Sequence, residues 1–135
     1  MACLDTTILI DGNGRDSALR ERCLAKIDDL AARGESLVTT CFNVAELYVG
    51  VARSDDAESE EKKVQRILGG LSILEFNDKA VKLFGQITAT LHQTGRPAGD
   101  MDVLIAATAM AHGHLLVTRN AAHFRSIPSL LLEQY

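Results

Sequence analysis

The amino-acid sequence predicts an α/β fold, a three-layer α/β/α sandwich in which helices cover both faces of a central parallel sheet of four to five strands. Short stretches of apolar and β-branched residues alternate along the chain with longer stretches whose apolar residues recur at helical spacing. Alternation of this kind is typical of parallel sheets with helices on both faces. With 135 residues, the chain has the length of one domain, so we expect a single domain over 1–135.

The first half of the chain is expected to contribute two strands and two helices. A very short buried strand, "ACL", ends at Asp5. A helix is expected over about 16–33, because Leu, Cys and Ile residues recur there at helical spacing, and Gly34 ends it. A second strand at 36–40, "SLVTT", leads into an apolar helix at 42–52.

The second half continues the alternation after a highly charged segment at 53–66, which we expect to form an exposed helix or a hairpin arm. The other expected elements are, in order, a strand at 71–76, an amphipathic helix at 78–95, an apolar helix within 97–113, a strand at 114–118 and a fifth strand within 129–135.

Composition narrows the class of protein. No apolar run approaches the roughly 18 residues that a membrane span needs, and no signal peptide is evident at the N-terminus. Cys3, Cys23 and Cys41 show no metal-ligand spacing, which favours reduced thiols in a cytoplasmic protein. The net charge is −4, so binding of a nucleic acid would need a local basic patch or bound cations.

Polar residues follow the expected strands where the strands end. Asp5 follows the first strand, and Thr118 ends the fourth. Ligands bind beyond the carboxyl ends of the strands in such sheets, which predicts a site there. Glu46, the only charged residue between Glu35 and Arg53, lies in the expected apolar helix. A carboxylate there needs a partner, since burying an unpaired charge is costly, although a salt bridge or an edge position would also account for it.

Two carboxylates, Asp100 and Asp102, precede the apolar helix within 97–113. Residues two apart do not share a helix face, so we expect Asp100 to be the N-cap and Asp102 to lie in the first turn. This helix must run antiparallel to the strand that follows Gly113, which brings Asp102 near the carboxyl end of that strand. If the first and fourth strands are neighbours, Asp5 lies there too, although Asp5 alone would also suit helix capping.

Asp5, Glu46 and Asp102 could therefore meet at one place. Three carboxylates close together repel one another, and apolar surroundings strengthen the repulsion. A hard divalent cation would stabilise such a cluster. All-oxygen ligands favour Mg²⁺ or Mn²⁺ over zinc, which prefers nitrogen and sulfur. An ion of this kind can support hydrolysis of a phosphodiester.

At these residues the chain resembles the PIN domains, and specifically the VapC-type toxin ribonucleases of type II toxin–antitoxin systems. The resemblance covers nearly the whole chain. The motifs that carry it are "LDTTILID", "NVAELYVGV" with Glu46, "GRPAGDMDVLIAATAMAHG" with Asp102, "LLVTRNAAHF" with Thr118 and Asn120, and "IPSLLLEQY".

The resemblance implies a Rossmann-like PIN fold and Mg²⁺- or Mn²⁺-dependent endoribonuclease activity. It implies that Asp5, Glu46 and Asp102 are the catalytic, metal-binding acids, with Asp100 and Asn120 as candidates for further ligands. It also implies a small cognate antitoxin and a homodimer or a toxin–antitoxin hetero-oligomer. Thr7 departs from the family pattern, in which the residue after "DT" is commonly Asn.

Several residues beside these acids are candidates for substrate contacts. The hydroxyls of Thr6 and Thr118 are expected to orient the ions, and Thr6, Thr118 and Arg119 are the candidate substrate-binding residues. Arg119, His123 and Arg125 are candidate phosphate contacts or ordinary surface residues. The apolar helix at 42–52 and the charged arm at 53–66 are expected to contribute to the antitoxin or dimer contact, because a helix that is apolar nearly all round needs a partner.

Two other readings remain open from the sequence. One is a non-catalytic interaction module on the same fold, although all three acids are present. The other is a phosphate-transfer domain that uses Asp5. Such domains place a Lys late in the chain, whereas the last Lys here is Lys82, before the fourth strand.

Overall fold

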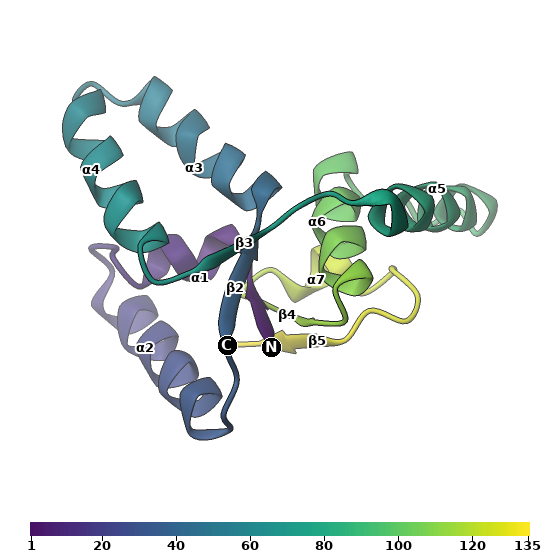
Figure 1. The fold of residues 1–135 in the computed structure, drawn as a ribbon, viewed down its shortest axis with the longest axis horizontal. Helices are drawn as coiled ribbons and strands as arrows, with labels where there is room; N and C mark the ends of the chain where they lie inside the picture. Colours follow the sequence, from purple (N-terminus) through teal and green to yellow (C-terminus); the bar gives the residue numbers. More distant parts are fainter.

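A computed structural model describes all 135 residues. Five parallel strands form one sheet in the order β3-β2-β1-β4-β5 (Figure 1). The strands are β1 (Ala2–Leu4), β2 (Leu37–Thr40), β3 (Ser72–Leu74), β4 (Leu115–Thr118) and β5 (Leu132–Gln134). The helices are α1 (Thr6–Asp11), α2 (Ser17–Ala32), α3 (Cys41–Arg53), α4 (Ala57–Leu68), α5 (Asp78–Gln93), α6 (Asp100–Ala111) and α7 (Ala121–Phe124).

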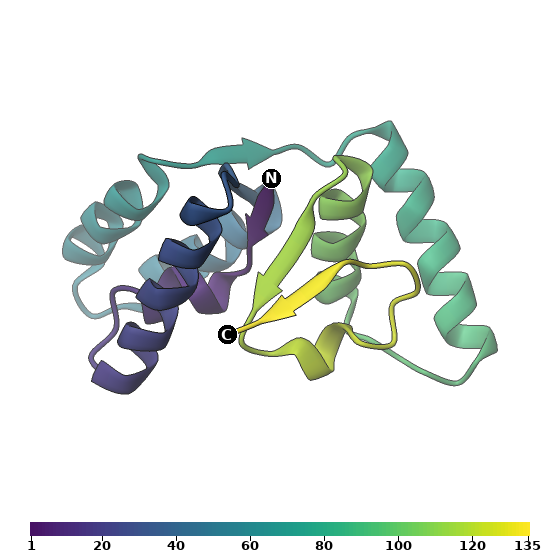
Figure 2. The ribbon, with the colours of Figure 1, turned by 90° about the horizontal axis from the view of Figure 1, so that it is seen from below.

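The helices form two groups on opposite faces of the sheet, which confirms the three-layer α/β/α architecture (Figures 1 and 2). Successive residues of a strand point to opposite faces. Cys3 and Leu116 accordingly join a core cluster with α5 and α6, whereas Leu4 and Val117 join a second cluster with α1, α2, α3 and α4. Each face of the sheet is therefore buried, as the apolar strands require.

The charged arm is a helix, α4, which packs against α3 (Figure 1). Asp56 caps it, because the Asp56 carboxylate accepts a hydrogen bond of 3.2 Å from the backbone N–H of Ser59. Its buried residue is Val64, while most of its acidic and basic residues are exposed. The charged arm thus has one narrow apolar side, and this side packs against the rest of the domain.

The structure contains two short helices that the apolar periodicity of the sequence does not predict. Helix α1 follows β1 directly, and α7 follows β4. They have six and four residues, which is too short for an apolar period to be recognised. Both begin at the carboxyl ends of strands, so they shape the region where a site is expected. No helix combines the length and the hydrophobicity that crossing a membrane requires.

Candidate acidic active site

The carboxyl ends of β1 and β4 lie side by side and bring the predicted acids to one pocket. The two strands are parallel neighbours, with Leu4 opposite Val117. Asp5 follows β1, Glu46 comes from α3, and Asp102 lies in the first turn of α6. All three line a pocket of about 270 Å³. The other residues that line it are Thr6, Thr7, Ile10, Arg119, Asn120, His123 and Phe124.

Asp5 is buried and held by two neutral side chains. Its Oδ1 accepts a hydrogen bond of 2.9 Å from the Asn43 amide, and its Oδ2 accepts one of 2.7 Å from the Thr118 hydroxyl. Asp5 is the N-cap residue of α1 by backbone geometry, but its side chain makes no capping bond. Capping therefore does not explain this carboxylate. Its oxygens are turned instead toward β4 and α3.

Glu46 is half-buried and has no cationic partner within the chain. Its Oε1 accepts a hydrogen bond of 2.7 Å from the Thr6 hydroxyl. Burial raises the pKa of Glu46; the Thr6 hydrogen bond opposes this, and the charges of Asp5 and Asp102 add to it. The salt-bridge interpretation of Glu46 is wrong, because the charge remains uncompensated.

Asp102 faces the same pocket with 27% of its side chain exposed. Its pKa is also raised, first by burial and then by Asp5, while the nearby imidazole of His123 lowers it. The His123 Nδ1 lies 3.7 Å from Asp102 Oδ2, a distance for electrostatic attraction and not for a good hydrogen bond. Asp102 is thus coupled to Asp5 and open to the pocket.

Asp100 does not have the position that the sequence predicts. The N-cap of α6 is Gly99, with Asp100 as the first helical residue, so the capping interpretation is wrong. Asp100 is exposed and is absent from the residues that line the acidic pocket. Two residues along a helix correspond to a turn of about 200°, so when Asp102 faces the pocket, Asp100 faces away.

Asn43 supports the site and escapes prediction from the sequence. It is fully buried, and its amide donates 2.9 Å hydrogen bonds to Asp5 Oδ1 and to the Thr6 hydroxyl oxygen. Its own carbonyl oxygen accepts a bond from the Thr40 hydroxyl, within a capping box at the start of α3. The sequence signal that could have identified Asn43 is the Thr-x-x-Asn pattern, because it resembles a capping box.

The remaining predicted contacts divide into two groups. Asn120, Arg119 and His123 line the acidic pocket, and the backbone N–H of Asn120 donates a 3.0 Å bond to the Thr118 hydroxyl oxygen. Arg125 does not line the pocket, and its guanidinium lies 3.3 Å from the side-chain oxygen of Gln134. The structure therefore places Arg125 away from the acids.

The donor set fits a hard cation, but the side chains do not converge on one point. No group of three or more His, Cys, Asp or Glu side chains is arranged to hold a single metal ion. The pocket nevertheless offers oxygen donors from three uncompensated carboxylates. Mg²⁺ typically binds to one or two carboxylates and keeps several waters. Such an ion could therefore be held without direct contact from all three acids.

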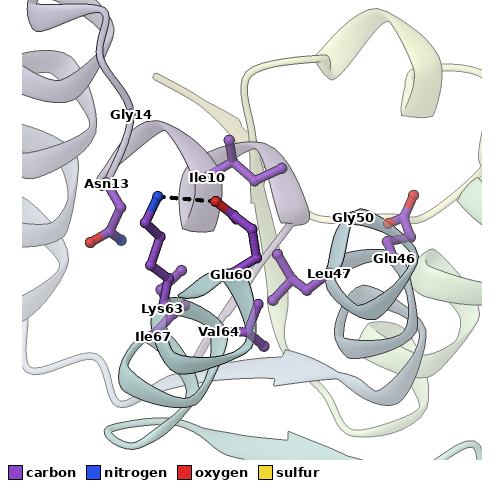
Figure 3. A pocket seen from close by; sticks show the side chains of 10 residues that line it. All are labelled: Ile10, Asn13, Gly14, Glu46, Leu47, Gly50, Glu60, Lys63, Val64 and Ile67. Carbon is purple, nitrogen blue, oxygen red and sulfur yellow. Dashed lines mark hydrogen bonds and ion pairs between the residues drawn. The ribbon is translucent and has the colours of Figure 1, made fainter. Parts of the chain in front are cut away.

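A second hollow, of about 230 Å³, adjoins the acidic pocket between α1, α3 and α4 (Figure 3). Ile10 and Glu46 line both hollows. Its walls are mainly apolar, and Lys63 forms an ion pair of 3.0 Å with Glu60 at its edge. On α3, which contributes Leu47 and Gly50 to this hollow, Val49 is 55% exposed.

Comparison with known proteins shows the family of this chain. Residues 2–130 match the PIN domain family. The chain belongs to this family. It is 34% identical over 107 residues to Ribonuclease VapC2 of Rickettsia felis, which covers 79% of this chain and 80% of that protein. It is 30% identical over 132 residues to Ribonuclease VapC2 of Haemophilus influenzae, which covers 98% of this chain and 96% of that protein.

PIN domain membership is also visible in the fold. The crystal structure of VapBC2 from Rickettsia felis, bound to a DNA fragment from its promoter, matches with a TM-score of 0.89 and 29% identity. The match covers 99% of this chain and 98% of that chain. In this PIN domain, the acidic pocket lies at the carboxyl edge of the sheet, where ligands of parallel α/β folds bind.

Proposed function

We propose that this PIN domain is a metal-dependent endoribonuclease that acts as the toxin of a toxin–antitoxin pair. The observation that carries the proposal is the acidic pocket, in which Asp5, Glu46 and Asp102 lie together without a compensating Lys or Arg ion pair. Two relatives at 30–34% identity are named ribonucleases, and a matching structure is a VapBC complex. These names support RNA as the substrate.

Carboxylates of the acidic pocket would hold the divalent cation, directly or through its bound waters, with Mg²⁺ preferred and Mn²⁺ able to replace it. When bound, such an ion supplies positive charge that stabilises the negative charge developing on the phosphodiester. Asn43 and Thr118 keep Asp5 fixed by both oxygens, and Thr6 fixes Glu46. These neutral donors orient the carboxylates without cancelling their charge, so the attraction for a cation is retained.

The pocket disfavours the phosphate-transfer alternative. The basic residues that line it are Arg119 and His123, and it contains no Lys. Asp5 is also engaged through both oxygens. A phosphodonor that labels Asp5 in the absence of RNA would favour that alternative over hydrolysis.

The direct test is cleavage of RNA by the purified chain. We expect cleavage with Mg²⁺ or Mn²⁺, loss of cleavage with excess chelator, and recovery when the ion is added back. Sequencing the ends of RNA after brief induction in cells would identify the substrate. Cleavage that persists after removal of divalent ions would contradict the metal-dependent mechanism. A chain that cuts no RNA with either ion would favour the non-catalytic alternative.

The antitoxin contact is proposed for the exposed apolar surface of α1 and α3 together with α4. Ile10 is exposed and lines the hollow in Figure 3. Val49 is exposed on α3, the helix whose Leu47 and Gly50 line the same hollow. Isolated apolar side chains need no partner, but a cluster that borders a hollow is typical of an interaction site. The VapBC complexes among the matching structures support an antitoxin as that partner.

A charge on this surface tests the contact. We expect Val49→Asp to reduce co-purification with the co-expressed antitoxin while leaving RNA cleavage by the free chain intact. Val81→Asp is the matched control, because Val81 lies on α5 with 50% exposure, against 55% for Val49. Equal retention of the antitoxin by both variants, together with unchanged binding after deletion of α4 and a monomeric isolated chain, would contradict the proposed surface.

A further inference from the structure

Asp11 is a buried carboxylate outside the acidic pocket, and two side chains from distant parts of the chain hold it. Its Oδ2 accepts a hydrogen bond of 2.8 Å from the Nε–H of Arg119 and one of 2.7 Å from the Tyr135 hydroxyl. Burial raises the pKa of the Tyr135 phenol, so the hydroxyl keeps the proton that it donates. The end of α1, the residue after β4 and the residue after β5 therefore meet at one carboxylate.

Arg119 connects this group to the acidic pocket. Its side chain is 39% exposed and lines the pocket, whereas the Asp11 side chain is only 7% exposed. Its backbone is fixed as well, because its N–H donates a 3.0 Å bond to Thr7 Oγ1 and its carbonyl accepts a 3.2 Å bond from the Gln134 amide. Arg119 is thus held by both its side chain and its backbone.

The charges around the pocket indicate a role for the fixed Arg119 side chain. Three carboxylates repel the phosphates of RNA, and Arg119 is the only Arg or Lys that lines the pocket. A guanidinium has five N–H donors, and Asp11 engages the one on Nε. A planar guanidinium suits the geometry of phosphate oxygens. Fixing it before the substrate arrives removes part of the ordering cost of binding.

We propose that Asp11 and Tyr135 are positioning residues that hold the Arg119 guanidinium to bind a phosphate group of RNA at the acidic pocket. The inference rests on the proposed ribonuclease function. Arg119 contacts the substrate, and the other two residues act through it. Neither Asp11 nor Tyr135 lines the acidic pocket, so they restrict the Arg119 side chain without occupying the place of the substrate.

The test compares KM and kcat for a labelled single-stranded RNA over a series of KCl concentrations at saturating Mg²⁺. We expect Arg119→Gln to raise KM about tenfold through loss of a charged contact, and to make the dependence of log(1/KM) on log[KCl] shallower by about 0.7. Tyr135→Phe removes one hydroxyl, so we expect KM to rise about threefold with a shallower slope and little change in kcat. In the Arg119→Gln background, Tyr135→Phe should have no further effect on KM.

Tyr48→Phe is the matched control. Tyr48 is the other tyrosine of the chain, is 39% exposed on α3, and donates no hydrogen bond within the protein. It should leave KM and the salt slope at wild-type values. Melting temperatures identify variants that are only partly folded. If Arg119→Gln does not fold, Asp11→Asn replaces it, since it keeps an acceptor oxygen but removes the charge that holds the guanidinium.

A merely structural role of Tyr135 predicts a different pattern. Tyr135→Phe would then leave the salt slope at its wild-type value, or would raise KM equally with and without Arg119, and either result overturns the inference. An unchanged slope for Asp11→Asn does so as well. Such results leave the proposed function intact when the wild-type chain cleaves RNA, whereas a wild-type chain that cleaves none overturns both.

Discussion

The carboxylates of the acidic pocket and those near the C-terminal strand differ in their partners. Asp5 and Glu46 accept hydrogen bonds only from neutral groups, Asn43, Thr118 and Thr6. By contrast, cations compensate Asp11 and Glu133. Arg119 pairs with Asp11 at 2.8 Å, and Lys26 and Arg33 pair with Glu133 at 2.7 and 2.9 Å.

The difference separates an acid that stabilises the fold from an acid that is available for chemistry. Ion pairs and hydrogen bonds lower the pKa of Glu133 from 4.5 to about 2. Burial and like charges raise the pKa of Glu46 and Asp102. A carboxylate without a cationic partner keeps its affinity for an external cation. A carboxylate that is already paired with Lys or Arg has little affinity left for one.

The largest effect is expected on activity. Asp102→Asn should reduce RNA cleavage more than about a hundredfold, because mutation even of residues that only support metal ligands typically costs ten- to a hundredfold. Rates of cleavage under saturating Mg²⁺ measure the loss. Asp100→Asn is the matched control, since it removes a carboxylate two residues away that is exposed and outside the pocket. Full activity of Asp102→Asn would show that this carboxylate is not needed for cleavage and belongs with the acids that stabilise the fold.

Removing the cation that pairs with Asp11 should lower the stability of the folded protein. Arg119→Gln leaves Asp11 buried without a charged partner, and we expect the free energy of unfolding to fall by about 2 kcal/mol. Urea denaturation measures it. Arg125→Gln is the control, because Arg125 is exposed and makes only one 3.3 Å hydrogen bond; its effect should stay within about 0.5 kcal/mol. Equal stabilities of the two variants would mean that Asp11 needs no cation.

In the acidic pocket, removal of a charge should raise the free energy of unfolding instead of lowering it. Glu46→Gln keeps an acceptor for Thr6 and removes one of the repelling charges. Because the folded state raises the pKa of Glu46, ionisation of Glu46 costs folding free energy near neutral pH, and the variant should gain up to about 1 kcal/mol without divalent ions. Saturating Mg²⁺ should then stabilise the wild type more than the variant. A loss of stability without metal would contradict the expected repulsion.

The smallest effect concerns acid stability at Glu133. Its folded-state pKa is lowered to about 2 from 4.5, so its contribution is present above pH 4.5 and is lost as the pH falls toward 2. The side chain is 29% exposed, and solvent screens its ion pairs, so the contribution should be less than about 1 kcal/mol. Comparing wild type with Glu133→Gln at pH 6 and pH 3 measures it. A difference that grows at pH 3 would contradict this sign.

Local sequence patterns predict the strands, the longer helices and the parallel sheet well. The strand at 114–118 and the helix at 78–95 match β4 and α5 closely, because apolar periodicity and glycine at helix ends are local signals. The same signals fail for α1 and α7, which are too short. They also misplace the cap of α6, since Gly99 and Asp100 are both acceptable at a helix start.

Residue order alone is enough to identify which acids follow strands and which helix carries Glu46. The partners of these acids, by contrast, depend on how the chain folds in space. Asn43 lies 38 residues from Asp5, and Tyr135 lies 124 residues from Asp11. Whether a carboxylate finds a neutral donor or a cation depends on contacts between segments that are distant in the chain. Desolvation and repulsion act over a few ångströms of space, which residue order does not specify.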